Sequence, residues 1–261
     1  ILNKPSPYLE LLKCVMKKQI DLVVEWSRVG FIHGVMNTDN MSIIGETIDY
    51  GPCAFLNKYD PQTVFSSIDR NGRYAFGNQH KIAYWNLLMF AETILPFIDK
   101  DKDSAIQIVK NYITQFPIHY SKKWHKMMFN KLGILNPINE DKLLIDKLLK
   151  LIESHQADYT NTFASLTMNK SHSDALSKSC DFQSWKKQWI KRIKKDDDSF
   201  KIMKMNNPIY IPRNHLVESA LKNAASGNKK EFDKLLNNMS KTYSYNTTHH
   251  ELQTTPPGFD D

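Results

Sequence analysis

Apolar residues recur every three or four positions along most of the chain, which is the pattern of amphipathic helices. The first such stripe lies between Tyr8 and Arg28, and Gly30 is placed to end that helix. The same spacing predicts helices over residues 8–28, 81–98, 104–115, 121–131, 140–154, 182–195, 214–225 and 229–239. We therefore expect a mainly α fold, with the segments rich in Gly, Pro and Asn as connecting loops.

Size and composition indicate one helical body with a polar end. A chain of 261 residues is long enough to bury a core. We expect this body over residues 1–240 and a loosely ordered tail over 241–261, where "KTYSYNTTHHELQTTPPGFDD" is polar and contains a Pro pair. No apolar run is long enough to cross a membrane, so we expect no membrane partner. Three widely spaced cysteines indicate free thiols in a reducing compartment, which favours a cytoplasmic location.

The positive charge of the chain does not by itself indicate a nucleic-acid partner. The net charge of +7 comes from 35 Lys and Arg against 28 Asp and Glu, and it is spread along the whole sequence. The most basic stretch is "SWKKQWIKRIKKDDD". Its apolar residues Trp185, Trp189 and Ile193 recur at helical spacing. We interpret this stretch as a helix with a buried Trp stripe and a solvated basic face, and expect no nucleic-acid binding.

The segment from Phe31 to Pro52, "FIHGVMNTDNMSIIGETIDYGP", breaks the helical pattern with a cluster of acidic and amide groups. Short apolar arms at 41–44 and 47–49 flank Gly45-Glu46, which predicts a short β-hairpin with a type II′ turn. Counting outward from that turn places Asn40 opposite Gly51, with Asp49 diagonal to Asn40 on the same face.

This predicted geometry brings together the ligands of a hard metal ion. One amide oxygen from Asn40 and one carboxylate from Asp49 suit Mg²⁺ or Mn²⁺, which commonly keep open positions for water and substrate phosphates. Asp39 then lies at the mouth of the loop, where its carboxylate is able to accept a proton from an attacking hydroxyl. The alternative is structural, because Asx side chains often only satisfy the backbone of a turn.

The same segment resembles the active site of protein kinases, which carry H-R-D-x-x-x-x-N followed by D-F-G. His33 and Asn40 have the kinase separation, and "DYG" at 49–51 stands in place of D-F-G. Val35 occupies the position of the kinase catalytic Asp, so ordinary kinase chemistry is not expected. Asp39, directly before Asn40, supplies the acidic group instead.

A longer set of motifs resembles the selenoprotein O family. It comprises "HGVMNTDNMSIIGETIDYGP", "FLNKYDP", "FSSIDRNGRYAFGNQ", "WNLLMFAETILP", "KLGI", "ADYTNTF" and "NPIYIPRNHLVE", and covers nearly the whole chain. The resemblance implies a pseudokinase fold that transfers AMP from ATP to protein Ser, Thr or Tyr hydroxyls. It further implies that Asp39 is the proton acceptor and that Asn40 and Asp49 bind magnesium, with Asp49 also close to the ATP phosphates.

The family pattern extends beyond this sequence. The resemblance implies a kinase-like C-terminal lobe, with the nucleotide-binding N-terminal lobe as its missing partner, so we expect the segment alone to be inactive. Two alternatives remain: a non-catalytic pseudokinase scaffold, favoured by Val35, and transfer of a phosphate or another nucleotide. Animal members of the family are mitochondrial, so the expected location depends on the source.

Two residues outside the predicted site have alternative roles. We expect His33 to pack beneath the loop and to hydrogen-bond the backbone. Arg73, in "NGRYAFGNQ", is placed either to reach a phosphate or protein substrate, or to form a buried ion pair.

Overall fold

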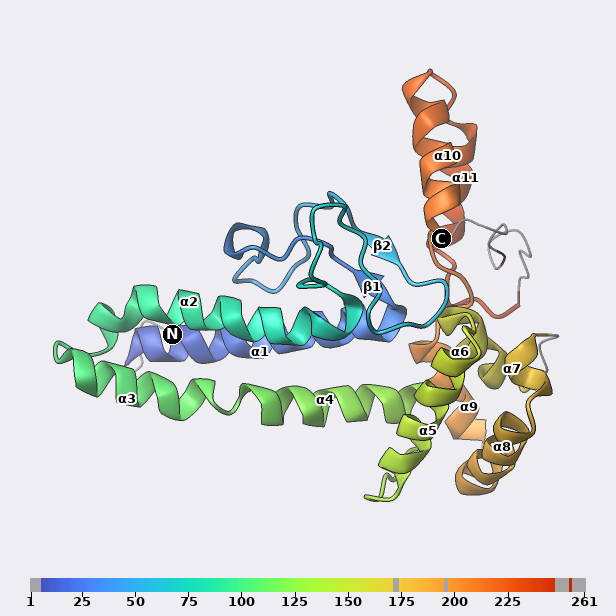
Figure 1. Ribbon diagram of the computed structural model, residues 1–261, viewed down its shortest axis with the longest axis horizontal. Helices are drawn as coiled ribbons and strands as arrows, with labels where there is room; N and C mark the ends of the chain where they lie inside the picture. Colours follow the sequence, from blue (N-terminus) through green and yellow to red (C-terminus); the bar gives the residue numbers. More distant parts are fainter. Residues whose placement is uncertain (1–5, 171–173, 195–196, 247–253, 255–261) are drawn as a thin grey trace. The chain divides into compact units, whose positions relative to one another are not determined.

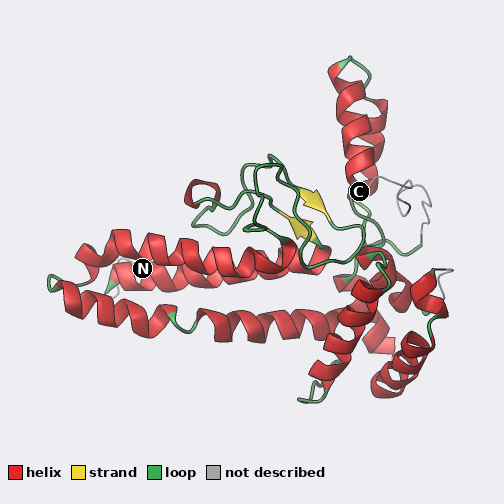
Figure 2. Cartoon of the chain, viewed as in Figure 1, coloured by secondary structure: helices red, strands yellow, loops and turns green. Residues whose placement is uncertain are grey.

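The computed structural model describes residues 6–170, 174–194, 197–246 and 254. These residues are mainly helical, as the apolar spacing predicts (Figures 1 and 2). The elements along the chain are α1 (Pro7–Val29), β1 (Phe31–Ile32), the 3₁₀ turn η1 (Thr38–Asn40), β2 (Ala54–Phe55), the 3₁₀ turn η2 (Phe76–Asn78), α2 (Gln79–Ile98), α3 (Lys102–Ile113), α4 (Phe116–Lys131), α5 (Asp141–Ser154), α6 (Tyr159–Thr167), α7 (Ala175–Lys178), α8 (Cys180–Ile193), α9 (Asp197–Asn206), α10 (Asn214–Ala225) and α11 (Lys230–Met239).

The chain divides into two compact units. The first contains the residues up to Ser27, Ile32–Cys53 and Pro61–His125, and the second contains Arg28–Phe31, Ala54–Asp60 and the chain after His125. In the first unit, α1, α2, α3 and the start of α4 run alongside one another, with the loops of residues 33–53 and 61–78 on one side of them (Figure 1). The candidate site lies in this unit.

Aromatic contacts hold the helices of the first unit together. The Tyr8 ring of α1 stacks on Phe97 of α2 with centroids 4.9 Å apart. His80 of α2 stacks on Tyr120 of α4 at 4.6 Å, and burial raises the pKa of Tyr120 to about 12. These contacts fix α1 and α2 as the base on which the polar loops rest.

The second unit is built around buried aromatic side chains. Trp185 and Trp189 of α8 are fully buried and donate their indole N–H groups to the carbonyls of Leu144 and Leu132. This confirms the Trp stripe predicted from the spacing. In the same unit, Tyr245 donates to the carbonyl of Asn207 at 2.8 Å, so the start of the predicted tail contacts this unit. Most of residues 241–261 lie outside the described part of the chain.

Three helices of the described residues, α6, the four-residue α7 and α9, were not predicted from the sequence. In α6 all nine residues are buried, polar Thr, Asn and Ser as well as apolar ones, so the helix has no solvated face. The helix α9 follows the basic stretch and starts with two acidic residues, which suit a helix N-terminus.

The small antiparallel sheet of the described chain pairs β1 with β2, and in the second unit the rings of Phe31 and Phe55 meet edge-on at 5.3 Å.

Candidate functional site

The predicted proton acceptor and one predicted metal ligand share a single 3₁₀ turn. Asp39 and Asn40 lie in η1, which closes with the Asn40 N–H donating to the Asn37 carbonyl at 3.0 Å. Asp39 is exposed, whereas Asn40 is partly buried. The tight turn therefore presents a carboxylate to solvent directly beside an anchored amide.

The orientation of the Asn40 side chain is set by one hydrogen bond. Its Nδ2 donates to the carbonyl of Val35 at 3.0 Å. Because the nitrogen is engaged with the backbone, the oxygen Oδ1 is the atom left to face a ligand. Val35, which occupies the kinase base position in the sequence, thus positions Asn40 through its main chain.

The predicted two-stranded hairpin at 41–49 is wrong in its register. The structure has an isolated antiparallel bridge between Met41 and Thr47, and the Gly45 N–H donates to the Ser42 carbonyl at 3.0 Å. The turn is therefore centred one to two residues earlier than predicted. The cause is α1: Gln19 donates to the Ser42 carbonyl at 2.6 Å, and Gly45, with φ +74°, lies so close to this helix that a Cβ would be 2.8 Å from the Cβ of Lys18.

Asp49 has an unusual backbone conformation. Its φ is +53°, in the left-handed region that non-glycine residues seldom adopt, and its carbonyl accepts the Gly51 N–H at 2.9 Å. The side chain is exposed. Such conformations persist where the surrounding structure enforces them, and they cluster at ligand-binding positions.

Contacts on both sides of Asp49 hold its segment against the segment of Asn40. On one side, Thr47 bridges to Met41, the neighbour of Asn40. On the other side, the backbone of Pro52 lies against Gly34, where an added Cβ would be 2.7 Å from the Pro52 carbonyl oxygen. The structure thus runs the two predicted ligand segments side by side, although the predicted strand pairing is absent.

His33 is buried and hydrogen-bonds the backbone of the Asp49 segment, as the sequence predicted. It is 1% exposed, and its Nε2 donates to the Ile48 carbonyl at 2.9 Å. Its ring lies 5.4 Å from Trp26 of α1, whose indole N–H donates to Thr47 Oγ1 at 2.8 Å. The contacts of His33 and Trp26 both hold the chain directly before Asp49, which supports the structural role expected for His33.

Arg73 lies in a loop that is tied to the same turn. Its exposed guanidinium stacks over Trp85 at 4.8 Å, which contradicts the buried ion pair considered from the sequence. The Asp69 carboxylate accepts the N–H groups of Arg73 and Tyr74 at 2.8 and 2.7 Å. Tyr74 then donates to Asn37 Oδ1 at 2.6 Å, at the start of η1.

This link from Arg73 to η1 was not predicted. "GRY" and "TDN" are far apart in sequence, and neither carries a local signal that the two loops meet. The structure therefore adds a cation, held by an aromatic stack, to the loops that carry the predicted acidic and amide groups.

Comparisons with known proteins identify the family of the chain. The family described as "Protein adenylyltransferase SelO" matches residues 1–240. The chain belongs to the SelO family. A SelO-family relative from Bacillus cereus (strain AH820), named "Protein nucleotidyltransferase YdiU", is 47% identical over 254 residues, which are 95% of this chain and 52% of the relative. The protein of the same name from Clostridium botulinum (strain Loch Maree / Type A3) is 49% identical over 248 residues, 93% of this chain and 50% of that protein.

The chain spans about half the length of the curated SelO-family relatives it matches. Within the described residues, no helix has the length and apolar content needed to cross a membrane. In the same residues, no group of three or more His, Cys, Asp and Glu side chains is placed to hold a metal ion. A metal held by Asn40 and Asp49 would therefore need most of its ligands from water and nucleotide phosphates, which is how Mg²⁺ is usually bound.

Proposed function

We propose that the intact protein transfers AMP from ATP to hydroxyl groups of proteins, with Asn40 and Asp49 as ligands of a divalent metal and Asp39 as the proton acceptor. The observation that carries this proposal is the anchored Asn40 amide beside the exposed Asp39, within a chain that matches the SelO family over residues 1–240. Mg²⁺ or Mn²⁺ fits this pair because the Asn40 amide and the Asp49 carboxylate both offer hard oxygen atoms.

Each residue has a separate task in the proposed reaction. Asp39 takes the proton of the acceptor hydroxyl as its oxygen attacks the α-phosphorus of ATP, and the bond from that phosphorus to the bridging oxygen of pyrophosphate breaks. Asn40 Oδ1 and the Asp49 carboxylate would hold the metal, which would supply positive charge to neutralise the phosphates. His33 and Trp26 hold the chain before Asp49 in place.

The direct test uses the intact protein and ATP labelled on the α- or the γ-phosphate. Asp39→Asn should keep metal-dependent nucleotide binding and lower the transfer rate about 10²- to 10⁴-fold, the usual contribution of a general base. Asp49→Asn should lower both binding and transfer. Glu46→Gln is the matched control, since Glu46 is an exposed acid of the same loop with no assigned role, and it should behave as the parent.

The position of the label separates this function from its alternatives. Incorporation of the α-label into protein supports adenylylation, and incorporation of the γ-label identifies phosphate transfer. Val35, at the kinase base position, favours a second candidate, a scaffold that does not react. Absence of both labels from every acceptor, with ATP still bound, would support that scaffold and contradict our proposal.

A further inference from the structure

The Arg73 side chain presents a positive charge at the surface of the first unit. It is exposed, and within the described part of the chain no carboxylate oxygen lies at ion-pair distance from its guanidinium. The guanidinium instead stacks 4.8 Å from the ring centre of Trp85, which is 39% exposed, and lies 5.6 Å from that of Tyr74. A stacked guanidinium keeps the N–H groups along its edge available for an oxyanion, which it binds through two parallel hydrogen bonds. Arg73 is therefore suited to hold a carboxylate or a phosphate.

The backbone around Arg73 is fixed as well. The Asp69 carboxylate accepts the N–H groups of Arg73 and Tyr74 at 2.8 and 2.7 Å. The Asn78 side chain donates to the Gly72 carbonyl at 2.8 Å. An arginine held at both its backbone and its side chain loses less conformational entropy on binding than a free surface arginine does. The position of the cation is thus defined before any ligand binds.

The loop of Arg73 is bonded to the turn that carries the proposed proton acceptor. Tyr74 directly follows Arg73, is 8% exposed and donates through its hydroxyl to Asn37 Oδ1 at 2.6 Å. Asn37 is the residue before η1, and Asp39 is two residues further along the chain. One buried side chain therefore couples the position of the cation to that of Asp39.

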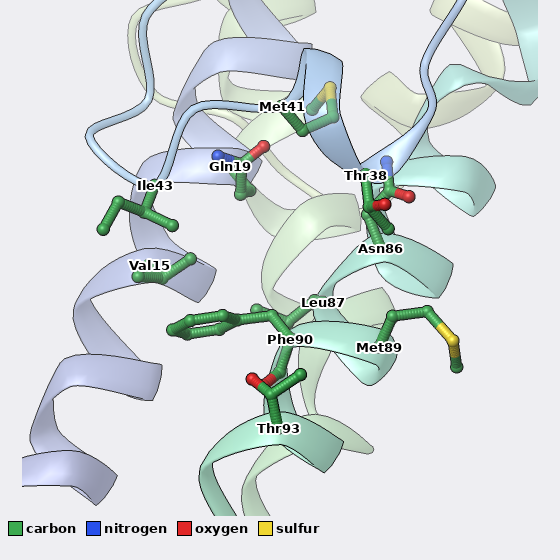
Figure 3. Close-up of a pocket in the computed structure, with 10 residues that line it drawn as sticks. All are labelled: Val15, Gln19, Thr38, Met41, Ile43, Asn86, Leu87, Met89, Phe90 and Thr93. Atoms are coloured by element: carbon green, nitrogen blue, oxygen red, sulfur yellow. The ribbon is translucent and has the colours of Figure 1, made fainter.

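The helix beneath the stack is bonded to the same segment. Asn86 follows Trp85 on α2, and its Nδ2 donates to the Met36 carbonyl at 3.0 Å. Figure 3 shows Asn86 beside Thr38, the first residue of η1, and the two residues line the same pocket. Both members of the stack are thus anchored to the residues directly before Asp39.

We propose that Arg73 selects the protein substrate: its guanidinium binds the carboxylate of an Asp or Glu that lies near the acceptor hydroxyl in the substrate sequence. This inference rests on the proposed function, in which Asp39 marks the position of that hydroxyl. It adds the substrate class, namely protein segments in which a Ser, Thr or Tyr has an acidic neighbour.

The phosphates of ATP offer the same oxyanion chemistry, but the contacts favour the acceptor protein. In the proposed site the phosphates accompany the metal at Asn40 and Asp49. The segment before Asp49 is paired with Met41, the residue after η1. The loop of Arg73 is instead bonded to the residue before η1. The two ends of η1 therefore separate this cation from the metal and the phosphates, and Asp39, whose partner is the acceptor, lies between them.

The test uses the intact protein and synthetic peptides with a single Ser as acceptors of the α-label from ATP. One Glu is placed in turn at each of the three positions on either side of the Ser, and each peptide is compared with the one that carries Gln instead. At one or more of these positions the Glu peptide should have a KM about fivefold to tenfold lower at an unchanged kcat, because a charged hydrogen bond to the bound peptide adds affinity alone. A parent protein that treats every Glu and Gln pair alike would overturn the proposal.

Variants of two arginines separate recognition of the peptide from other roles. Arg73→Met removes the charge but keeps an unbranched apolar chain over Trp85, and it should abolish the Glu preference. Arg73→Glu should reverse the preference, so that a peptide with Lys at the same position becomes the better acceptor. Arg70→Met is the matched control and should keep the preference, because Arg70 is an exposed arginine of the same loop on which no aromatic ring of the described residues stacks.

Three results with these variants would contradict the proposal. An equal fall in kcat for all peptides, with the Glu preference intact, would indicate a structural role for Arg73. A higher KM for ATP in Arg73→Met, again with the preference intact, would place Arg73 on a phosphate. The same loss of preference in Arg70→Met would show a general effect of charge. Circular dichroism checks that each variant folds.

Peptide binding distinguishes failure of this proposal from failure of the proposed transfer. Fluorescent versions of the same peptides are titrated with the intact protein and a non-hydrolysable ATP analogue, and anisotropy reports binding. The parent should bind the Glu peptide more tightly than the Gln peptide, and Arg73→Met should bind both alike. This result without any transfer of label would refute only the proposed function. Equal binding of the two peptides by the parent would refute the role of Arg73, whether or not label is transferred.

Discussion

Gly34 provides a sharp test of how the candidate site is held together. Its φ is +84°, and a Cβ at this position would lie 2.7 Å from the carbonyl oxygen of Pro52. Pro52 follows Asp49 by three residues, so this close approach is one of the contacts that hold the Asp49 segment against the loop before Asn40. We predict that Gly34→Ala separates the two segments.

The cost of Gly34→Ala has two parts. An alanine in the left-handed region costs about 1–2 kcal/mol relative to its preferred conformations. The clash involves a backbone oxygen, which cannot rotate away as a side chain would, and overpacking of this kind costs about 1–3 kcal/mol more. The expected loss in the free energy of unfolding is therefore about 2–5 kcal/mol.

Gly72→Ala is the matched control because it isolates the first part of the cost. Gly72 belongs to the same unit and has φ +66°, but its added Cβ would meet only ordinary contacts, at 3.8 Å from Ala75 and 3.9 Å from Val64. Urea unfolding of the intact variants should show Gly34→Ala to be about 1–3 kcal/mol less stable than Gly72→Ala. Hydrogen exchange should also accelerate in residues 33–52. If the two variants lose the same stability, the close packing of Gly34 on Pro52 does not support the site.

Two other predictions concern ionisable side chains removed from solvent. Burial lowers the pKa of His80 from 6.5 to about 4, so the folded state resists a proton that the unfolded state accepts. The contribution of neutral His80 to stability is present above pH 6.5 and is lost as the pH falls toward 4. Urea unfolding at pH 7 and pH 4.5 should therefore show a smaller loss in the free energy of unfolding for His80→Gln than for the parent. The fully buried Arg213 contacts Asp158 at 2.7 Å and Asn57 at 2.5 Å. Arg213→Met should cost about 3 kcal/mol, and adding Asp158→Asn should recover part of it, whereas full additivity of the two changes would contradict a direct pair.

Local sequence pattern determined the elements that have one buried and one solvated face. The stripe of Trp185, Trp189 and Ile193 was predicted because a helix repeats every 3.6 residues, and all three side chains are buried in α8. Gly30 was predicted to end the first helix, and the structure gives it φ +76° directly after α1. By contrast, α6 has no solvated face, so its sequence contains no period to detect.

The candidate site shows the same division. The sequence alone selected Asp39, Asn40 and Asp49 as candidates, because their residue types and their motif suit the proposed chemistry. The sequence did not predict the register of the loop. Gln19 and Trp26 of α1 position the turn through hydrogen bonds to Ser42 and Thr47. Such contacts join residues more than 20 positions apart, and no local pattern encodes them. The motif therefore predicted which residues are candidates, whereas the packing of α1 against the loop determined where they lie.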